Sequence, residues 1–193
     1  MVPRQAESYG PVIANLLAED RLAPLGPGTP NIQARDTLSR LNPEDLFPGT
    51  QVRDEPMGRA CLSGLWLYHD FLDESHGLSQ EIPSATDSYW HGIMHRREPD
   101  FGNSKYWFRR VGNHPVFPQL AEAAPDIFES MAGARELDAA RDLARGSSWD
   151  PFKFIDLCQT SIRVPSDLQL FCRKVQDAEW WLLFDFCFRA AGG

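Results

Sequence analysis

Helix start signals recur along this chain, and they constrain its fold more than any other feature. The segment NPED at 42–45 and the pair Asp150-Pro151 each place a capping side chain before a proline at the first helical position. Ser166 opens the longest helical pattern, which runs to about residue 190. No stretch alternates in the manner of a β-strand. The sequence therefore predicts an all-α protein.

The length and composition favour one domain over residues 1–193. A chain of 193 residues with 42% hydrophobic residues can bury a single substantial core. Within it we expect an N-terminal strap with short helices at 1–50, a region of helical hairpins at 58–112 and a long C-terminal helix at 166–190. The proline- and glycine-rich stretch at 22–31 belongs to the strap and suits a surface loop.

The charge and the apolar segments exclude several classes of protein. A net charge of −8 argues against a nucleic-acid partner, because phosphate neutralisation needs a surplus of Lys and Arg. The most apolar segment, at 179–188, is interrupted by Asp185 and is too short to span a membrane. We find no secretory signal and expect a cytoplasmic protein. The four cysteines form no C-x-x-C pair, so we expect reduced core residues.

Residues 85–112 carry a recognisable spacing of small and aromatic residues. Gly92 is followed twelve positions later by Ser104 and four further on by Phe108. This segment resembles a tetratricopeptide-type helical hairpin, although His91 and His95 stand where that pattern prefers Leu and an aromatic residue. The helical stretches along the whole chain predict a compact bundle of eight or nine helices. The resemblance implies that tetratricopeptide-like hairpins pack on its long C-terminal helix.

The wider motif at 87–117 resembles one in bacterial and fungal proteins of unknown function. That resemblance implies no activity.

The histidines of this segment fall on one side of a predicted helix. At about 100° per residue, Asp87, His91, His95 and Glu98 share a narrow arc, opposite an apolar stripe. One interpretation turns the polar arc to water. The other turns it toward the preceding helix, which ends near residue 80 and carries His76.

The second interpretation predicts a metal site made by His76, His91, His95 and Glu98. Two histidines at i and i+4, a third from a neighbouring helix and an acid are suitable ligands for zinc or iron with one position open. Gly92 follows His91, so the acid of the H-E-x-x-H protease motif is absent. The site is thus a hypothesis from ligand type and spacing.

A second candidate site is basic and aromatic. Its predicted ligand-binding residues are Arg96, Arg97, Asn103, Lys105 and Arg109. Arginine offers a planar fork for phosphate or carboxylate groups, so this patch would take a peptide or small anionic ligand. The alternative is a set of exposed ion pairs, such as Arg96 with Asp100 at i and i+4.

Two functions follow from these candidates. The first is a binding or interaction protein that recognises a peptide or small anionic ligand at the hairpin junction, since stacked hairpins form concave surfaces. The second is a metal-dependent enzyme or sensor with a histidine-rich transition-metal site. Glu179 is a further carboxylate that we expect to project toward the histidines if it lies in a cleft.

Overall fold

The computed structural model describes residues 6–80, 84–131, 133–134 and 137–192. The expected strap and hairpin region extend to residues 1–5 and 81–83, which lie outside those ranges. Within them the regular structure is entirely helical, which confirms the all-α prediction, although the helices outnumber the eight or nine expected. In chain order they are η1 (Ala6–Tyr9), α1 (Pro11–Leu16), α2 (Ile32–Leu38), η2 (Pro43–Leu46), α3 (Glu55–Tyr68), α4 (Leu72–Ser79), α5 (Ala85–Arg97), α6 (Phe101–Val111), α7 (Val116–Glu129), α8 (Asp138–Ala144), α9 (Pro151–Ser161) and α10 (Asp167–Ala191), where η marks a 3-10 helix.

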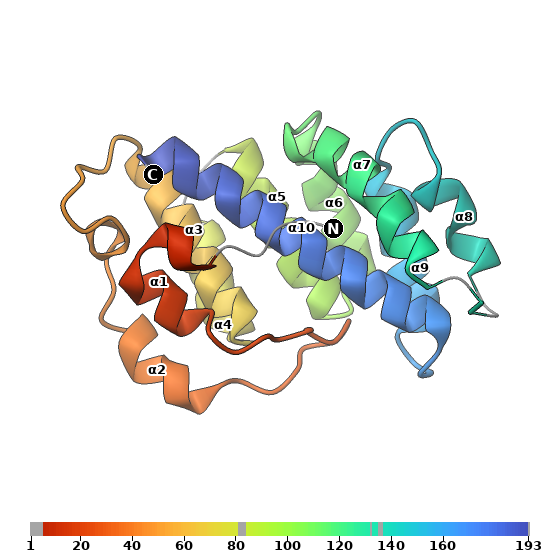
Figure 1. The fold of residues 1–193 in the computed structure, drawn as a ribbon, viewed down its shortest axis with the longest axis horizontal. Helices are drawn as coiled ribbons and strands as arrows, with labels where there is room; N and C mark the ends of the chain where they lie inside the picture. The colour runs from red at the N-terminus through yellow and green to blue at the C-terminus, as the bar shows by residue number, and fades with distance from the viewer. Residues whose placement is uncertain (1–5, 81–83, 132, 135–136, 193) are drawn as a thin grey trace.

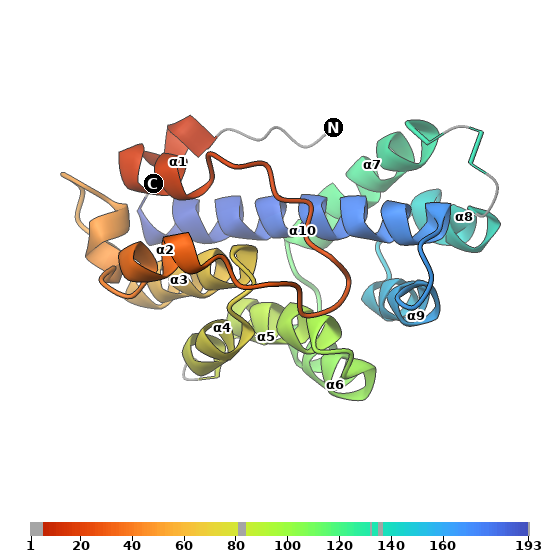
Figure 2. The ribbon, with the colours of Figure 1, turned by 90° about the horizontal axis from the view of Figure 1, so that it is seen from below.

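Helix α10 is the axis around which the other helices are arranged (Figure 1). It packs against α3 toward its C-terminal end and against α7 and α9 toward its N-terminal end. Figure 2 shows α4, α5 and α6 gathered on one side of α10 and α1 on the opposite side. The α4–α5–α6 layer is therefore held on the rest of the molecule, with α5 in its middle.

Side-chain caps fix the helix starts that the sequence indicated. The Asp150 carboxylate accepts hydrogen bonds from the backbone N–H groups of Phe152 and Lys153, at 3.0 and 3.1 Å. The Ser166 hydroxyl accepts one from Gln169 N–H at 3.1 Å and starts α10. These side chains satisfy donors that have no intrahelical partner, so the boundaries follow from local chemistry.

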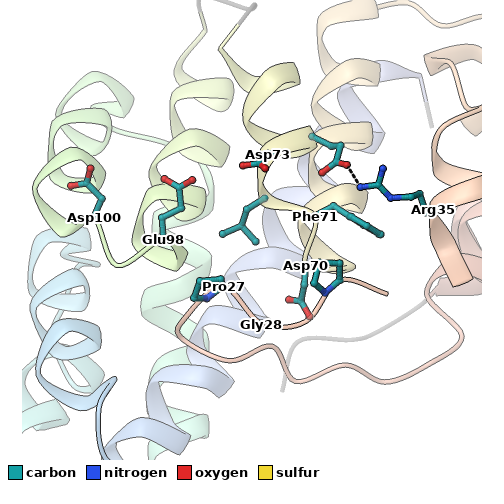
Figure 3. A pocket seen from close by; sticks show the side chains of 11 residues that line it. Pro27, Gly28, Arg35, Asp70, Phe71, Asp73, Glu98 and Asp100 are labelled. Atoms are coloured by element: carbon teal, nitrogen blue, oxygen red, sulfur yellow. Dashed lines mark hydrogen bonds and ion pairs between the residues drawn. The ribbon is translucent and has the colours of Figure 1, made fainter. Parts of the chain in front are cut away.

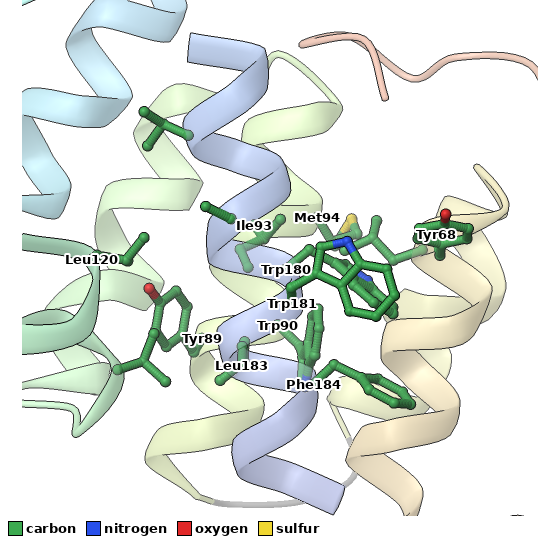
Figure 4. Packing of buried hydrophobic residues seen from close by; sticks show 14 of the residues in the cluster. Tyr68, Tyr89, Trp90, Ile93, Met94, Leu120, Trp180, Trp181, Leu183 and Phe184 are labelled. Carbon is green, nitrogen blue, oxygen red and sulfur yellow. The ribbon is translucent and has the colours of Figure 1, made fainter. Parts of the chain in front are cut away.

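The centre of the core is aromatic and lies between α10, α3 and α5 (Figure 4). Trp180 is buried and its indole N–H donates to the Gly64 carbonyl at 2.9 Å. A Cβ on Gly64 would lie 2.8 Å from the ring of Trp90, so glycine permits this close contact between α3 and α5. Trp66 and Trp181 are also buried, as expected for core residues.

Helices α5 and α6 form a tight hairpin at the predicted register. A Cβ on Gly92 would lie 2.7 Å from the Phe108 ring, and the Ser104 hydroxyl donates to the Gly92 carbonyl at 2.7 Å. Every residue of α5 from Thr86 to Arg97 is buried. Both stripes of this helix are thus covered, which excludes the interpretation with a water-facing polar arc. The tetratricopeptide resemblance itself stays a prediction.

Two other expectations concern cysteines and membranes. Cys61, Cys158, Cys172 and Cys187 are all free and buried, as expected for core residues. Among the helices of the described ranges, none has the length and apolarity needed to cross a bilayer.

Candidate metal centre

Three histidines converge in the seam between α4 and α5. His91 and His95 lie one turn apart on α5, and His76 faces them from α4. One ring nitrogen of each residue lies within 4.8 Å of the other two. The ring centroids are 4.5 Å apart for His76 and His91, 5.4 Å for His76 and His95, and 4.8 Å for His91 and His95. The prediction that these imidazoles face the preceding helix is confirmed.

A small closing movement would bring these nitrogens to coordination distance. Zinc–nitrogen bonds of about 2.0–2.1 Å in a tetrahedral site place two nitrogens about 3.4 Å apart. The longest separation in the cluster is 4.8 Å, so it must shorten when a metal binds. His76 is half-buried on the short helix α4, and its side chain is the one best placed to move.

The local capping chemistry sets the orientation of α5. The Ser84 hydroxyl accepts a hydrogen bond from Asp87 N–H at 3.1 Å and donates to the Asp87 carboxylate. The Ser84 side chain thus caps the helix and fixes its first turn. His91 and His95 follow one and two turns after Asp87, so the helical repeat places all three side chains on the same face of α5.

The His95 ring is held by polar neighbours on two sides. Its Nδ1 lies 3.0 Å from a carboxylate oxygen of Glu98. Its Nε2 lies 3.0 Å from the amide nitrogen of Asn103, which is also 3.4 Å from Nδ1. Since a carboxylate can only accept, Nδ1 carries the proton and Nε2 has the lone pair. A carboxylate on one ring nitrogen and a free lone pair on the other is the usual arrangement of a metal-binding histidine.

The His91 ring is held by packing. It stacks on the indole of Trp107 from α6, with centroids 3.9 Å apart and planes inclined by 22°. Its Nδ1 is buried and has no hydrogen-bond partner among the described residues. A buried polar nitrogen without a partner is costly in a native fold. Here that nitrogen belongs to the imidazole that shares the seam with His76 and His95.

Burial keeps His91 and His95 neutral. Burial, together with charge repulsion from His76 and His95, lowers the pKa of His91 to about 3. Burial also lowers the pKa of His95, although Glu98 opposes that shift. Neutral imidazole is the form that binds metals, so these two rings need not lose a proton at neutral pH to do so.

Glu98, the fourth predicted ligand, lies outside the group of three converging histidines. Its hydrogen bond to His95 Nδ1 makes it a residue that orients the His95 ring. It also lines a cavity of about 630 Å³ between the strap and the first turn of α4 (Figure 3). The lining residues are Pro27, Gly28, Pro30, Arg35, Asp70, Phe71, Leu72, Asp73, Glu74, Glu98 and Asp100.

The predicted anion site is not assembled around its two arginines. Arg96 is fully buried, forms an ion pair with Glu179 on α10 and lies 4.6 Å over the Phe154 ring. Arg97 is buried and bonds to Asp70 at 2.5 Å. Its guanidinium also donates to the backbone carbonyls of residues 26 and 27 in the strap. Both guanidinium groups are used inside the fold.

The other three residues of the predicted set lie on α6, but they do not gather at one place. Asn103 contacts His95, whereas Lys105 bonds to Asp156 on α9 at 2.5 Å, and Arg109 is exposed. Of the five predicted residues, Asn103 is the one that the fold brings to the histidines.

Two interpretations of acidic residues, one for Asp100 and one for Glu179, were wrong. Arg96 does not pair with Asp100, whose carboxylate instead accepts from Asn103 N–H at 3.1 Å and caps α6. Glu179 does not project toward the histidines, because it is fully buried against Arg96.

Sequence reasoning missed Trp107 and Asp70. The aromatic residues of 106–108 all suited a core role, and the contact of Trp107 with His91 depends on how α5 meets α6. Asp70 has a φ of 63°, which is uncommon for a residue other than glycine. Its carboxylate binds both Arg97 and Arg21, and neither partner is near it in sequence.

Comparison with known proteins gives no match. No family model fits the chain, and neither a curated protein nor a solved structure is significantly similar to it. The functional argument therefore rests on the chemistry of the site.

Proposed function

We propose that this protein binds a transition metal through His76, His91 and His95, with one coordination position open. The observation that carries the proposal is the convergence of three imidazoles from two helices, with one nitrogen of each within 4.8 Å of the others. Three protein ligands and an open fourth position are typical of reactive zinc sites. The protein would act as a metal-dependent enzyme or sensor.

The ligand set favours zinc over iron. Imidazole suits zinc, copper, nickel and iron, but non-haem iron oxygenases use two histidines and a carboxylate. Here the carboxylate of Glu98 bonds to His95 Nδ1, which leaves three nitrogen ligands. An all-histidine site with an open position is the arrangement in which zinc activates a bound water.

The surroundings of the cluster support the proposal. Glu98 orients His95, and Trp107 fixes the plane of His91. Such contacts orient metal ligands before the ion binds. The four reduced cysteines suit a reducing compartment, and we place the protein in the cytoplasm on that ground.

Metal analysis of protein purified without an affinity tag tests the proposal. We expect one zinc per chain, and His76→Ala should weaken zinc binding by more than the 10–100-fold that loss of an outer contact costs. His114→Ala is the matched control, because His114 is also a buried histidine and it bonds to Thr86 and to Val116 N–H, away from the cluster.

The two variants separate a metal site from a packed group of neutral histidines. If His76→Ala and His114→Ala bind zinc equally well, the ion lies elsewhere and the proposal is wrong. Protein that keeps its fold and takes up no zinc, cobalt or iron on titration would also contradict it.

A further inference from the structure

The α6 side of the histidine cluster presents one hydrogen-bond donor at the ligand position. The Asn103 amide nitrogen lies 3.0 Å from His95 Nε2. The same nitrogen lies 3.4 Å from Nδ1, so the amide sits beside the ring, off the line of the Nε2 lone pair. Nε2 has the lone pair because Nδ1 faces the Glu98 carboxylate, and that lone pair stays open to a metal. This assignment follows from the hydrogen-bond partners.

This donor would lie beside a bound metal. Coordination uses the Nε2 lone pair, and the Asn103 amide nitrogen stays 3.0 Å from Nε2 on a different side of that atom. Its N–H then has no acceptor on the ring. An atom bound at the open position can supply the missing acceptor.

The charge of the site favours an anion at that position. Three neutral imidazoles around a divalent ion leave a net charge of +2, because no carboxylate belongs to the converging group. Three nearby cations are already paired: Arg96 and Arg97 are buried in ion pairs, and Lys105 is bound to Asp156. Arg110 lies over the Trp107 ring, 5.3 Å from its centroid, but it is exposed, so solvent screens its charge.

These limits point to a small anion of low charge. A planar carboxylate can place one oxygen on the metal and the other on the Asn103 amide. A phosphate dianion would need further cations, and Glu98, which lies beside His95, would repel it. The ligand class is therefore narrower than the peptide or anion expected from the sequence.

Resting on the proposed metal site, we infer that its open position takes a small carboxylate-type anion and that the Asn103 amide donates a hydrogen bond to it. Asn103 is thus a specificity-determining residue. Donors aimed at an oxygen on a metal act in the same way as those of an oxyanion hole.

Cobalt-loaded protein titrated with sodium acetate provides the test. Cobalt replaces zinc in such sites, and its visible spectrum reports the fourth ligand. We expect a saturable spectral change in the native chain. Asn103→Ala should weaken acetate binding about tenfold or more, the effect of losing a hydrogen bond to a charged group. Cobalt stoichiometry should remain one per chain.

Two variants make the result specific. Asn103→Asp keeps the size of the side chain and replaces its donor with a negative charge, so it should weaken acetate binding further while cobalt is retained. Arg109→Ala is the matched control, because Arg109 is an exposed cation on the same helix. It should leave acetate affinity unchanged, and circular dichroism checks that each variant is folded.

Several outcomes would overturn the inference. A cobalt spectrum that acetate does not alter, an Asn103→Ala variant with native acetate affinity, or phosphate that binds more tightly than acetate each contradicts it while the metal site stands. An equal loss in Arg109→Ala would show general charge attraction and would also contradict it. If cobalt does not bind at all, the proposed function fails first, and metal analysis distinguishes that case.

Discussion

Helix α5 carries two kinds of buried polar side chain, and they are satisfied in different ways. Arg96 and Arg97 each bond to a buried carboxylate from a distant part of the chain, Glu179 and Asp70 respectively. His91, one turn earlier, has a buried Nδ1 without a partner among the described residues. Each guanidinium charge is thus paired, although Arg96 Nε, like His91 Nδ1, lacks a hydrogen-bond partner among the described residues. What distinguishes His91 is that its ring lies beside two other imidazoles, the group to which we assign the proposed metal.

The largest effect on stability is expected at the buried Arg96–Glu179 pair. Arg96→Met should lower the free energy of unfolding by about 3–5 kcal/mol, because it leaves a buried carboxylate without its partner. Urea denaturation measures the loss. The double variant Arg96→Met/Glu179→Leu should recover much of it, since no buried charge then remains.

Arg109→Met is the control for that experiment, because Arg109 is exposed on α6. It should leave the stability nearly unchanged. Equal losses in the two single variants would show that the buried pair has no special role.

Zinc binding at the histidine cluster of α4 and α5 should raise the thermal stability of the protein. A ligand that binds only the folded state, at 100 times its Kd, adds about 2.7 kcal/mol to stability. For a chain of 193 residues this corresponds to a rise in Tm of roughly 5–10 °C. Thermal denaturation with and without zinc measures the rise. It should vanish in His76→Ala and persist in His114→Ala, and a rise of equal size in both would contradict the assignment.

A smaller effect is expected where Glu98 orients His95. Glu98→Gln removes the charge that bonds to Nδ1 and should raise the Kd for zinc about 10–100-fold. Competition with a chelating dye measures the Kd. Glu74→Gln is a matched control, because Glu74 lines the same cavity but pairs with Arg35. If Glu98→Gln binds zinc with native affinity, Glu98 does not orient His95 for metal binding.

The smallest effect concerns acid stability of the metal-free protein. The pKa of His91 falls from 6.5 to about 3 on folding, so the unfolded state binds the proton between those values. This difference destabilises the folded state progressively as the pH falls from 6.5 toward 3, and it has no effect above pH 6.5. His91→Gln removes that acid penalty and should therefore move the midpoint of acid unfolding to lower pH, as followed by tryptophan fluorescence.

The other buried groups set the background for that measurement. Burial lowers the pKa of His69 and His114 to about 4, with the same sign as for His91. Burial raises the pKa of Asp87 to about 6, which has the opposite sign and favours folding at acid pH. An acid midpoint in His91→Gln that stays unchanged or rises would contradict the proposed burial of the neutral imidazole.

The local features of the fold were predictable because they depend on neighbours in sequence. The caps at Ser84, Asp150 and Ser166 use acceptors and donors within three residues, so their outcome could be read directly. The i and i+4 spacing of His91 and His95 likewise fixes a shared helix face. The Asp185–Arg189 pair also obeys this spacing, at 2.7 Å.

The polar contacts between helices were harder to predict from the sequence. Arg96 had an acid at i+4, but it pairs with Glu179, which is 83 positions away. The spacing of residues along one helix predicts contacts within that helix, but it does not predict which side chains of another helix pack against it. The predicted anion patch failed for this reason, because its two arginines turned inward to acids from α10 and from the end of α3.

The sequence by itself determined an all-α chain, the starts of its main helices and the ligand types available near its middle, since these depend on contacts within one turn. The tertiary structure alone decided which buried groups are matched. Packing brought Glu179 to Arg96, Asp70 to Arg97 and Trp107 to His91, and it brought His76 against α5. Those pairings arise from helices that meet across the core, and their geometry is set by packing rather than by sequence spacing.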